Sequence, residues 1–307
     1  MNSLKEYVLV TEDVTKVYGK HKAVNRVSMH VEKGAIYGFI GKNGAGKTTF
    51  MRMVAGLATP TMGQMELFGS KDLERQRIRI GTLIENPGAF GNMTAYENLE
   101  VVRRQFGITD KHVVGGMLEF VGLSGTGKKK VKNFSMGMKQ RLGIGIALLR
   151  NPDFLILDEP INGLDPEGII EIRELLLKLN REREITILIS SHILGELSKI
   201  ATHYGIIRDG ALIEEFGEQE LVNRCRRCHK VIVDNTELAA NILEEKLHIT
   251  GFDIPQQNTV RIFERLEETE KTNRELVVGG VNVKESYLAG QDLEGYFMEL
   301  LGGGENV

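Results

Sequence analysis

The segment Gly41–Thr48, with the sequence GKNGAGKT, has the residue types and spacing of a phosphate-binding loop. In such a loop several backbone N–H groups converge on phosphate oxygens, the lysine adds a positive charge, and the hydroxyl can bind Mg²⁺. A flexible glycine-rich turn is the alternative, although strand-like residues 35–40 and helix-like residues 47–57 flank the loop as phosphate binding requires. We therefore predict that phosphate is bound by Gly41, Lys42, Asn43, Gly44, Ala45, Gly46, Lys47, Thr48 and Thr49.

Two acids, Asp158 and Glu159, directly follow the apolar run Phe154–Leu157. A carboxylate at the end of a buried strand can provide a second anchor for a Mg²⁺ ion held by Thr48, and Asp158 fits that role. Glu159 can then accept a proton from an attacking water molecule. Taken alone, an acid pair at a strand end is as well explained by a helix cap or by surface charge.

Two further segments could reach a phosphate. His192 follows the apolar run 186–189 and could contact a terminal phosphate, although a lone histidine is more often structural. The segment 134–141, FSMGMKQR, predicts a helix start with Ser135 as the N-cap, and free N–H groups behind Gly137 could bind an anion. An ordinary helix start explains the same pattern in isolation.

The elements that must position these residues alternate between buried strands and helices. Short β-branched runs alternate with helical stretches such as Pro166–Leu179, which has apolar residues on one face. Alternation of this kind predicts an α/β fold with a mainly parallel sheet. Residues 85–149 contain no clear strand, so a helical insertion is expected there.

Composition narrows the class of protein. The 307 residues carry a net charge of −3, which provides no basic field for nucleic acid. Two cysteines fit a reducing cytosol rather than a disulfide scaffold. No apolar stretch approaches the length of a membrane span, and residues 1–10 do not look like a secretory signal. Any membrane role is therefore expected to depend on a partner.

Together the motifs resemble, in order and spacing, the nucleotide-binding subunits of ATP-binding-cassette (ABC) transporters over residues 9–216. The phosphate loop resembles the Walker A motif, and residues 154–159 resemble the Walker B strand with its catalytic glutamate. Residues 163–166 are similar to the D-loop, which includes Asp165. The remaining matches are Tyr18 for adenine stacking, His192 for the switch histidine, and Ser135, Gly137 and Gln140 for the signature motif, here FSMGMKQR rather than LSGGQ.

The resemblance implies an ABC-type P-loop NTPase domain over residues 1–220, with a helical subdomain at about 85–150. It implies ATP and Mg²⁺ as ligands. It also implies a head-to-tail dimer, expected to be a homodimer, in which Ser135 and Gly137 complete the site of the partner. A polytopic permease on a separate chain would hold the subunit at the inner face of the cell membrane, in the cytoplasm. No nucleic acid partner is expected.

Glu85 departs from the family pattern, since it stands in LIENP where the family has a glutamine that contacts Mg²⁺ and water. A carboxylate keeps an oxygen for the metal but loses the amide donor and adds negative charge. We therefore predict that Glu85 takes part in catalysis and metal binding. The same replacement resembles the branch that exports bacitracin and lantibiotic peptides, which predicts export for antibiotic resistance. Soluble cassettes that act in sensing, translation or chromosome handling are the alternative.

Residues 221–307 are expected to form a small accessory α+β domain. Within it, CRRCH at residues 225–229 formally fits a c-type haem motif, but the absence of an export signal favours a basic, loop-like linker. Its cysteines could form a reversible thiol pair, and its basic residues could face anionic lipid headgroups. The expected elements alternate strand and helix: strand 231–233, helix 237–247, strand 259–263, helix 266–277, strand 281–283 and helix 292–301.

Overall fold

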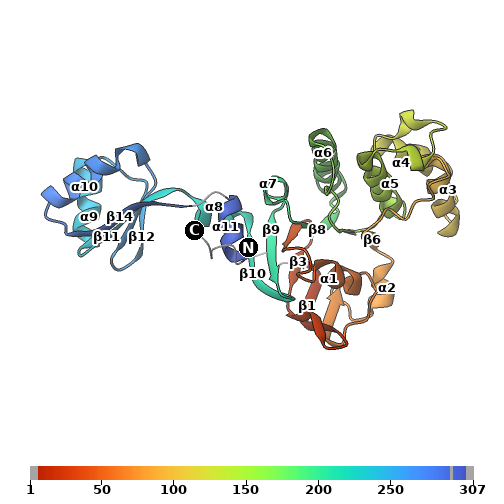
Figure 1. The fold of residues 1–307 in the computed structure, drawn as a ribbon, viewed down its shortest axis with the longest axis horizontal. Helices are drawn as coiled ribbons and strands as arrows, with labels where there is room; N and C mark the ends of the chain where they lie inside the picture. The colour runs from red at the N-terminus through yellow and green to blue at the C-terminus, as the bar shows by residue number, and fades with distance from the viewer. Residues whose placement is uncertain (1–5, 291–292, 302–307) are drawn as a thin grey trace. The chain divides into compact units, whose positions relative to one another are not determined.

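Continuous apolar runs become the strands of a six-stranded central sheet in the computed structural model, which describes residues 6–290 and 293–301 (Figure 1). Five of the strands are parallel, and β10 forms an antiparallel edge. The strand order is β10 (Ala211–Gly217), β9 (His203–Arg208), β4 (Ile36–Ile40), β8 (Thr186–Ser191), β7 (Phe154–Leu157) and β6 (Ile80–Leu83). Residues of β4, β7 and β8 are buried throughout, as expected for parallel strands covered on both faces. The predicted α/β class is confirmed.

The register of the central strands brings the chemistry-bearing segments to one edge of the sheet. Ile40 of β4 pairs with Ser191 of β8, and Leu157 of β7 pairs with Ile189 of the same strand. The carboxyl ends of β4, β7 and β8 are therefore adjacent. After β4 the glycine loop leads into α1 (Lys47–Val54), which ends three residues before the predicted end.

A second, antiparallel sheet covers α1, and the sequence reasoning did not anticipate it. It contains β1 (Tyr7–Tyr18), β2 (His21–Val27), β3 (His30–Glu32) and β5 (Met62–Leu67), all arranged around β1. Apolar residues of this sheet share one core with Phe39 of β4 and Phe50 of α1. This shared core fixes α1, and with it the glycine loop, between the two sheets.

The chain between β6 and β7 consists of helices and turns. After the short α2 (Leu73–Arg77) and β6, it forms α3 (Ala95–Gln105), α4 (His112–Phe120) and α5 (Met136–Leu148). Thr94 caps α3 in a reciprocal capping box with Glu97. The three helices pack on one another, and α5 also packs on α6 (Pro166–Arg183), the helix that follows β7. A short helix, α7 (Leu194–Leu197), follows β8.

The chain divides into two compact units: the described residues up to Glu218, joined by Leu300 and Leu301, and the described residues within Gln219–Glu299. The second unit contains a four-stranded antiparallel sheet of order β12-β13-β11-β14. Its elements are α8 (Glu218–Cys225), β11 (Cys228–Val233), α9 (Thr236–Asn241), a π-helical turn (Ile242–Lys246), β12 (Phe252–Gln256), β13 (Thr259–Ile262), α10 (Thr269–Val278), β14 (Val283–Ala289) and α11 (Leu293–Leu300). From β11 to β14 this is a β-α-β-β-α-β, ferredoxin-like arrangement.

Several sequence predictions for this unit were wrong. The expected basic linker at residues 225–229 is a loop only at residues 226–227, since Cys225 ends α8 and the buried Cys228 and His229 begin β11. The last strand begins at Val283, where the predicted strand ended, and β12 was not predicted at all. Both missed strands are sheet edges with mostly exposed or half-buried residues, so they lack a strong apolar pattern. Residue 292, the predicted start of the last helix, lies outside the described residues.

Residues 6–290 and 293–301 contain neither a cluster of metal-binding side chains nor a membrane-spanning helix. No group of three or more histidine, cysteine, aspartate or glutamate side chains there could hold a metal ion. Cys225 and Cys228 are not joined in a disulfide. In that same part of the chain, no helix has both the length and the hydropathy needed to cross a bilayer.

Candidate active site

The glycine loop is shaped by positive backbone angles and by close backbone packing. Gly44 and Gly46 have φ angles of 83° and 105°, which L-residues with side chains rarely adopt. A Cβ atom at Gly41 would lie 2.5 Å from the carbonyl oxygen of Ile207, and one at Gly46 would collide with that of Ala23. The loop therefore needs glycine at these positions, and its backbone wraps tightly around the N-terminus of α1.

A pocket of about 350 Å³ opens beside this loop. Its walls bring together Tyr18 at the end of β1, the loop, and Glu159 after β7, although these lie far apart in the sequence. The described lining residues are Tyr18, His21, Ala23, Asn43, Gly44, Ala45, Gly46, Lys47, Thr48, Thr49 and Glu159. The structure therefore collects most of the predicted phosphate-binding residues around one cavity, with an exposed tyrosine ring at its rim.

Lys47 is held against the loop from inside. Its side chain is 6 % exposed, and Nζ donates a hydrogen bond of 2.6 Å to the carbonyl oxygen of Gly41. Nζ also lies 3.3 Å from Oε1 of Glu159. A buried ammonium group in this position presents its charge to whatever enters the loop, as a phosphate-binding lysine must.

Thr48 and Asp158 form a close pair of oxygen atoms. Thr48 Oγ1 donates a hydrogen bond of 2.6 Å to Asp158 Oδ2, and Ser190 Oγ donates one of 2.6 Å to Oδ1 of the same carboxylate. Asp158 and Ser190 are buried. Hydroxyl and carboxylate oxygens are the hard ligands that Mg²⁺ uses together with phosphate and water, so the donor set fits that ion.

Glu159 stands between the lysine and the histidine. Its Oε2 lies 2.7 Å from His192 Nδ1, while Oε1 is buried and accepts no hydrogen bond from the described part of the chain. The approach of Lys47 Nζ to Oε1 is an ion pair without hydrogen-bond alignment. One carboxylate oxygen is thus oriented by His192 while the other keeps a free lone pair. That arrangement suits a proton acceptor.

Glu85 does not join the Thr48–Asp158 pair in this structure. Its Oε1 lies 2.6 Å from Nη2 of Arg52 on α1, and both side chains are partly exposed. The backbone at Glu85 has a φ angle of 66°, in the left-handed region. The carboxylate that the sequence assigns to metal binding is therefore paired with an arginine instead.

Four predicted residues lie apart from the pocket. Ser135 caps α5, since its Oγ accepts a hydrogen bond of 3.3 Å from the backbone N–H of Met138. Asp165 caps α6 in the same way through Gly168. An added Cβ at Gly137 would meet nothing closer than Gly168 Cα, at 3.8 Å, so the starts of α5 and α6 are neighbours.

Gln140 is the fourth of these residues. It is 8 % exposed, and its Oε1 finds no hydrogen-bond partner within the described chain. None of the four lines the pocket beside the glycine loop. The structure therefore separates the predicted nucleotide-contacting residues into two groups.

Sequence reasoning missed Ser190 and Arg52. Ser190 orients Asp158 and also accepts a hydrogen bond of 2.8 Å from the backbone N–H of Glu159. The Ser190 hydroxyl, at the end of an apolar run, was a usable signal in the sequence. Its pairing with Asp158 depends on β8 lying beside β7, which the sequence does not state. Arg52 gave no such signal, because an arginine on an amphipathic helix is usually a solvent-exposed residue.

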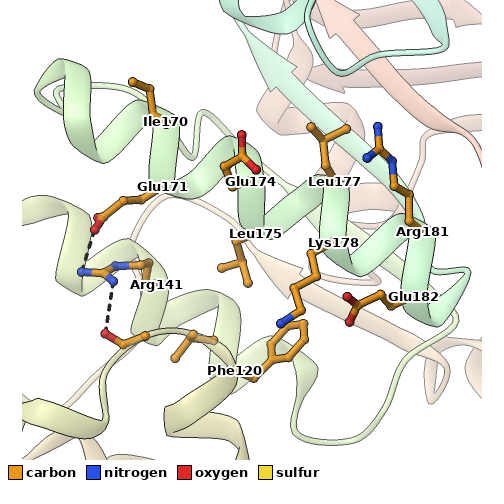
Figure 2. A pocket seen from close by; sticks show the side chains of 12 residues that line it. Phe120, Arg141, Ile170, Glu171, Glu174, Leu175, Leu177, Lys178, Arg181 and Glu182 are labelled. Carbon is orange, nitrogen blue, oxygen red and sulfur yellow. Dashed lines mark hydrogen bonds and ion pairs between the residues drawn. The ribbon is translucent and has the colours of Figure 1, made fainter.

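A larger cavity lies elsewhere. It has a volume of about 640 Å³ and is lined by α6, the C-terminal end of α4 and Arg141 of α5 (Figure 2). Figure 2 shows Arg141 bridging Glu171 and the backbone of Gly122, at 3.4 and 3.2 Å, and Lys178 reaching over the ring of Phe120. None of the predicted site residues lines it.

A glycine loop between a strand and a helix, a buried lysine, a hydroxyl–aspartate pair and a histidine-oriented glutamate together define a P-loop ATPase. The family model described as ABC transporter matches residues 24–162. The bacitracin transport ATP-binding protein BcrA of Enterococcus faecalis is 43 % identical over 98 % of both chains. The chain belongs to the ABC family and is the ATP-binding, ATP-hydrolysing subunit of a transporter.

Further comparisons agree with this assignment. The protein of the same name from Bacillus licheniformis is 43 % identical over 97 % of this chain and 98 % of its own. The lantibiotic transport ATP-binding protein SrtF of Streptococcus pyogenes is 43 % identical over 68 % of this chain and 90 % of its own. A nucleotide-free ATP-binding cassette of an ABC transporter has a TM-score of 0.63 at 28 % identity, covering 71 % of this chain and 94 % of that cassette.

Proposed function

We propose that this chain supplies the ATP-driven step in the export of a peptide antibiotic of the bacitracin or lantibiotic class, and so confers resistance or immunity. One observation carries the proposal: the likeness to bacitracin transport proteins extends over both units of the chain, including the accessory unit. A role in sensing, translation or chromosome handling does not account for that full-length match. The substrate path would lie in a polytopic permease on another chain.

In the proposed mechanism, the loop amides and Lys47 bind the phosphates of ATP. Thr48 and Asp158 would hold Mg²⁺, and the bound ion would neutralise developing phosphate charge. Glu159 Oε1 accepts a proton from the attacking water, since it is the carboxylate oxygen without a hydrogen bond. His192 orients Glu159 through Oε2 and can contact the terminal phosphate.

The second group of residues supports a head-to-tail dimer. Ser135, Gly137, Gln140 and Asp165 do not line the pocket of their own chain, and they would complete the pocket of a second copy. Gly137 has no side chain at the start of α5, so a partner's phosphate could approach the backbone N–H groups of the first turn closely. Tyr18 would stack on the adenine ring. A homodimer bound to its permease at the cytoplasmic face of the membrane, without nucleic acid, is the assembly we propose.

The test is antibiotic susceptibility in a sensitive host that expresses this chain with its partner permease. The wild type should raise the inhibitory concentration of bacitracin or of a lantibiotic. Glu159→Gln should abolish that protection and slow ATP hydrolysis by about 10²-fold or more while ATP still binds. Glu182→Gln, at an exposed glutamate that lines the separate cavity beside α6, is the matched control. Protection that survives in Glu159→Gln would contradict hydrolysis-driven export and favour a sensing role.

A further inference from the structure

Arg52 and Glu85 meet at the same edge of the sheet as the proposed metal pair. Arg52 lies four residues after Thr48 on α1, so the two share one face of the helix. Glu85 lies two residues beyond the end of β6, whose Leu83 pairs with Leu157 of β7 and accepts a hydrogen bond of 2.8 Å from the backbone N–H of Asp158. Arg52 therefore shares a helix face with Thr48, and Glu85 follows the strand beside the one that leads to Asp158.

The charges at this edge are balanced in pairs. Lys47 lies 3.3 Å from Glu159, and Arg52 lies 2.6 Å from Glu85. Asp158 is instead satisfied by two hydroxyl groups. Glu85 would otherwise add an uncompensated negative charge beside a site for polyphosphate, and the guanidinium of Arg52 neutralises that charge.

The Arg52–Glu85 ion pair can dissociate at little cost in free energy. Its side chains are 39 % and 54 % exposed, and ion pairs with that exposure contribute little net stability. The left-handed backbone at Glu85, at a φ angle of 66°, is uncommon for a residue with a side chain and persists only where surrounding contacts hold it. A divalent cation would compete with the guanidinium for the same carboxylate oxygen.

We propose that Arg52 is a positioning residue that holds the Glu85 carboxylate beside α1 when no nucleotide is bound and yields it to the metal–nucleotide complex. The proposal rests on the proposed function of Thr48 and Asp158 as a Mg²⁺ site. A glutamine at position 85 would carry no negative charge. Arg52 would then have no charge to neutralise, and the metal would have no carboxylate to compete for. Arg52 and Glu85 therefore act as one unit in this chain.

A double-mutant cycle in equilibrium ATP binding tests the proposal. The full-length chain and its variants Arg52→Gln, Glu85→Gln and the double variant are titrated with ATP in excess EDTA and at graded Mg²⁺ concentrations. Arg52→Gln should weaken binding in EDTA, because Glu85 is left uncompensated, and should lower the Mg²⁺ concentration for half-maximal binding about two- to fivefold. In the Glu85→Gln background, Arg52→Gln should change neither quantity.

The matched control is Arg79→Gln. Arg79 pairs with Asp153 at 2.6 Å with side-chain exposures of 44 % and 56 %, nearly those of the first pair, but before β6 and β7 rather than after them. It should leave the Mg²⁺ dependence unchanged. Equal shifts from Arg52→Gln in both backgrounds, or no shift in either, would overturn the proposal. Failure of the wild type itself to bind ATP more tightly with Mg²⁺ would instead contradict the Thr48–Asp158 assignment.

Discussion

Ser190→Ala removes a hydroxyl that connects the two acids of the site. In the wild type, Ser190 Oγ donates a hydrogen bond of 2.6 Å to Asp158 Oδ1 and accepts one of 2.8 Å from the backbone N–H of Glu159. The side chain of Ser190 is fully buried. A hydrogen bond to a charged group contributes about 1.5–3 kcal/mol, and an orphaned buried N–H costs about 1–3 kcal/mol. We therefore expect the free energy of unfolding of the first unit to fall by about 2.5–6 kcal/mol.

The assay is urea denaturation of the full-length chain. Unfolding is monitored with a probe in the first unit, because the two units can unfold separately. Ser191→Ala is the control. Ser191 is also buried, and its hydroxyl accepts a hydrogen bond of 2.9 Å from the backbone N–H of Ile193, so the loss should be about 1 kcal/mol. Equal midpoints for the two variants would refute the reasoning, since they would show that the Ser190 bridge adds nothing beyond an ordinary turn.

Two other substitutions and a labelling experiment are informative. Gly137→Ala should leave the urea midpoint unchanged, because a Cβ atom there meets nothing closer than 3.8 Å. It should abolish ATPase activity if a second copy approaches that position. Retained activity would contradict the proposed dimer. Gly46→Ala should destabilise the loop and prevent ATP binding, because the φ angle is 105° and the Cβ collides with Ala23; measured ATP affinity at the wild-type value would contradict this. Burial raises the pKa of the Cys228 thiol, so less of it is thiolate at pH 8. Iodoacetamide at that pH should therefore modify Cys225 first by peptide mass, and the reverse order would contradict the buried position of Cys228.

The parts of the site that come from consecutive residues could be predicted from the sequence. The glycine loop, Asp158 and Glu159 are local patterns whose chemistry follows from residue type and from a neighbouring strand. The contribution of Ser190 and the pairing of Arg52 with Glu85 depend on which strands are adjacent. The order of the strands is set by packing over the whole sheet, so it cannot be predicted from the spacing of residues along the chain.

The accessory unit was predicted less well because its edge strands carry little apolar signal. β14 has no fully buried residue among Val283–Ala289, and β12 contains Pro255 and Gln256. Their positions follow from pairing with β11 and β13, which are mostly buried and were found in the sequence. The position of an edge strand is determined more by the strand that it pairs with than by the residues next to it in the sequence.

The room for a methyl group at Gly137 has a genetic consequence. A Gly137→Ala chain would fold and accumulate as well as the wild type, because the added methyl group would meet Gly168 and Leu164 only at ordinary van der Waals distances of 3.8 and 4.0 Å. In a homodimer with sites shared between copies, each mixed pair would contain one damaged site. Such an allele would be dominant over the wild type when both are expressed. A loop allele such as Gly46→Ala also damages one site of a mixed pair, and it would be closer to recessive only where the collision with Ala23 keeps its product from folding.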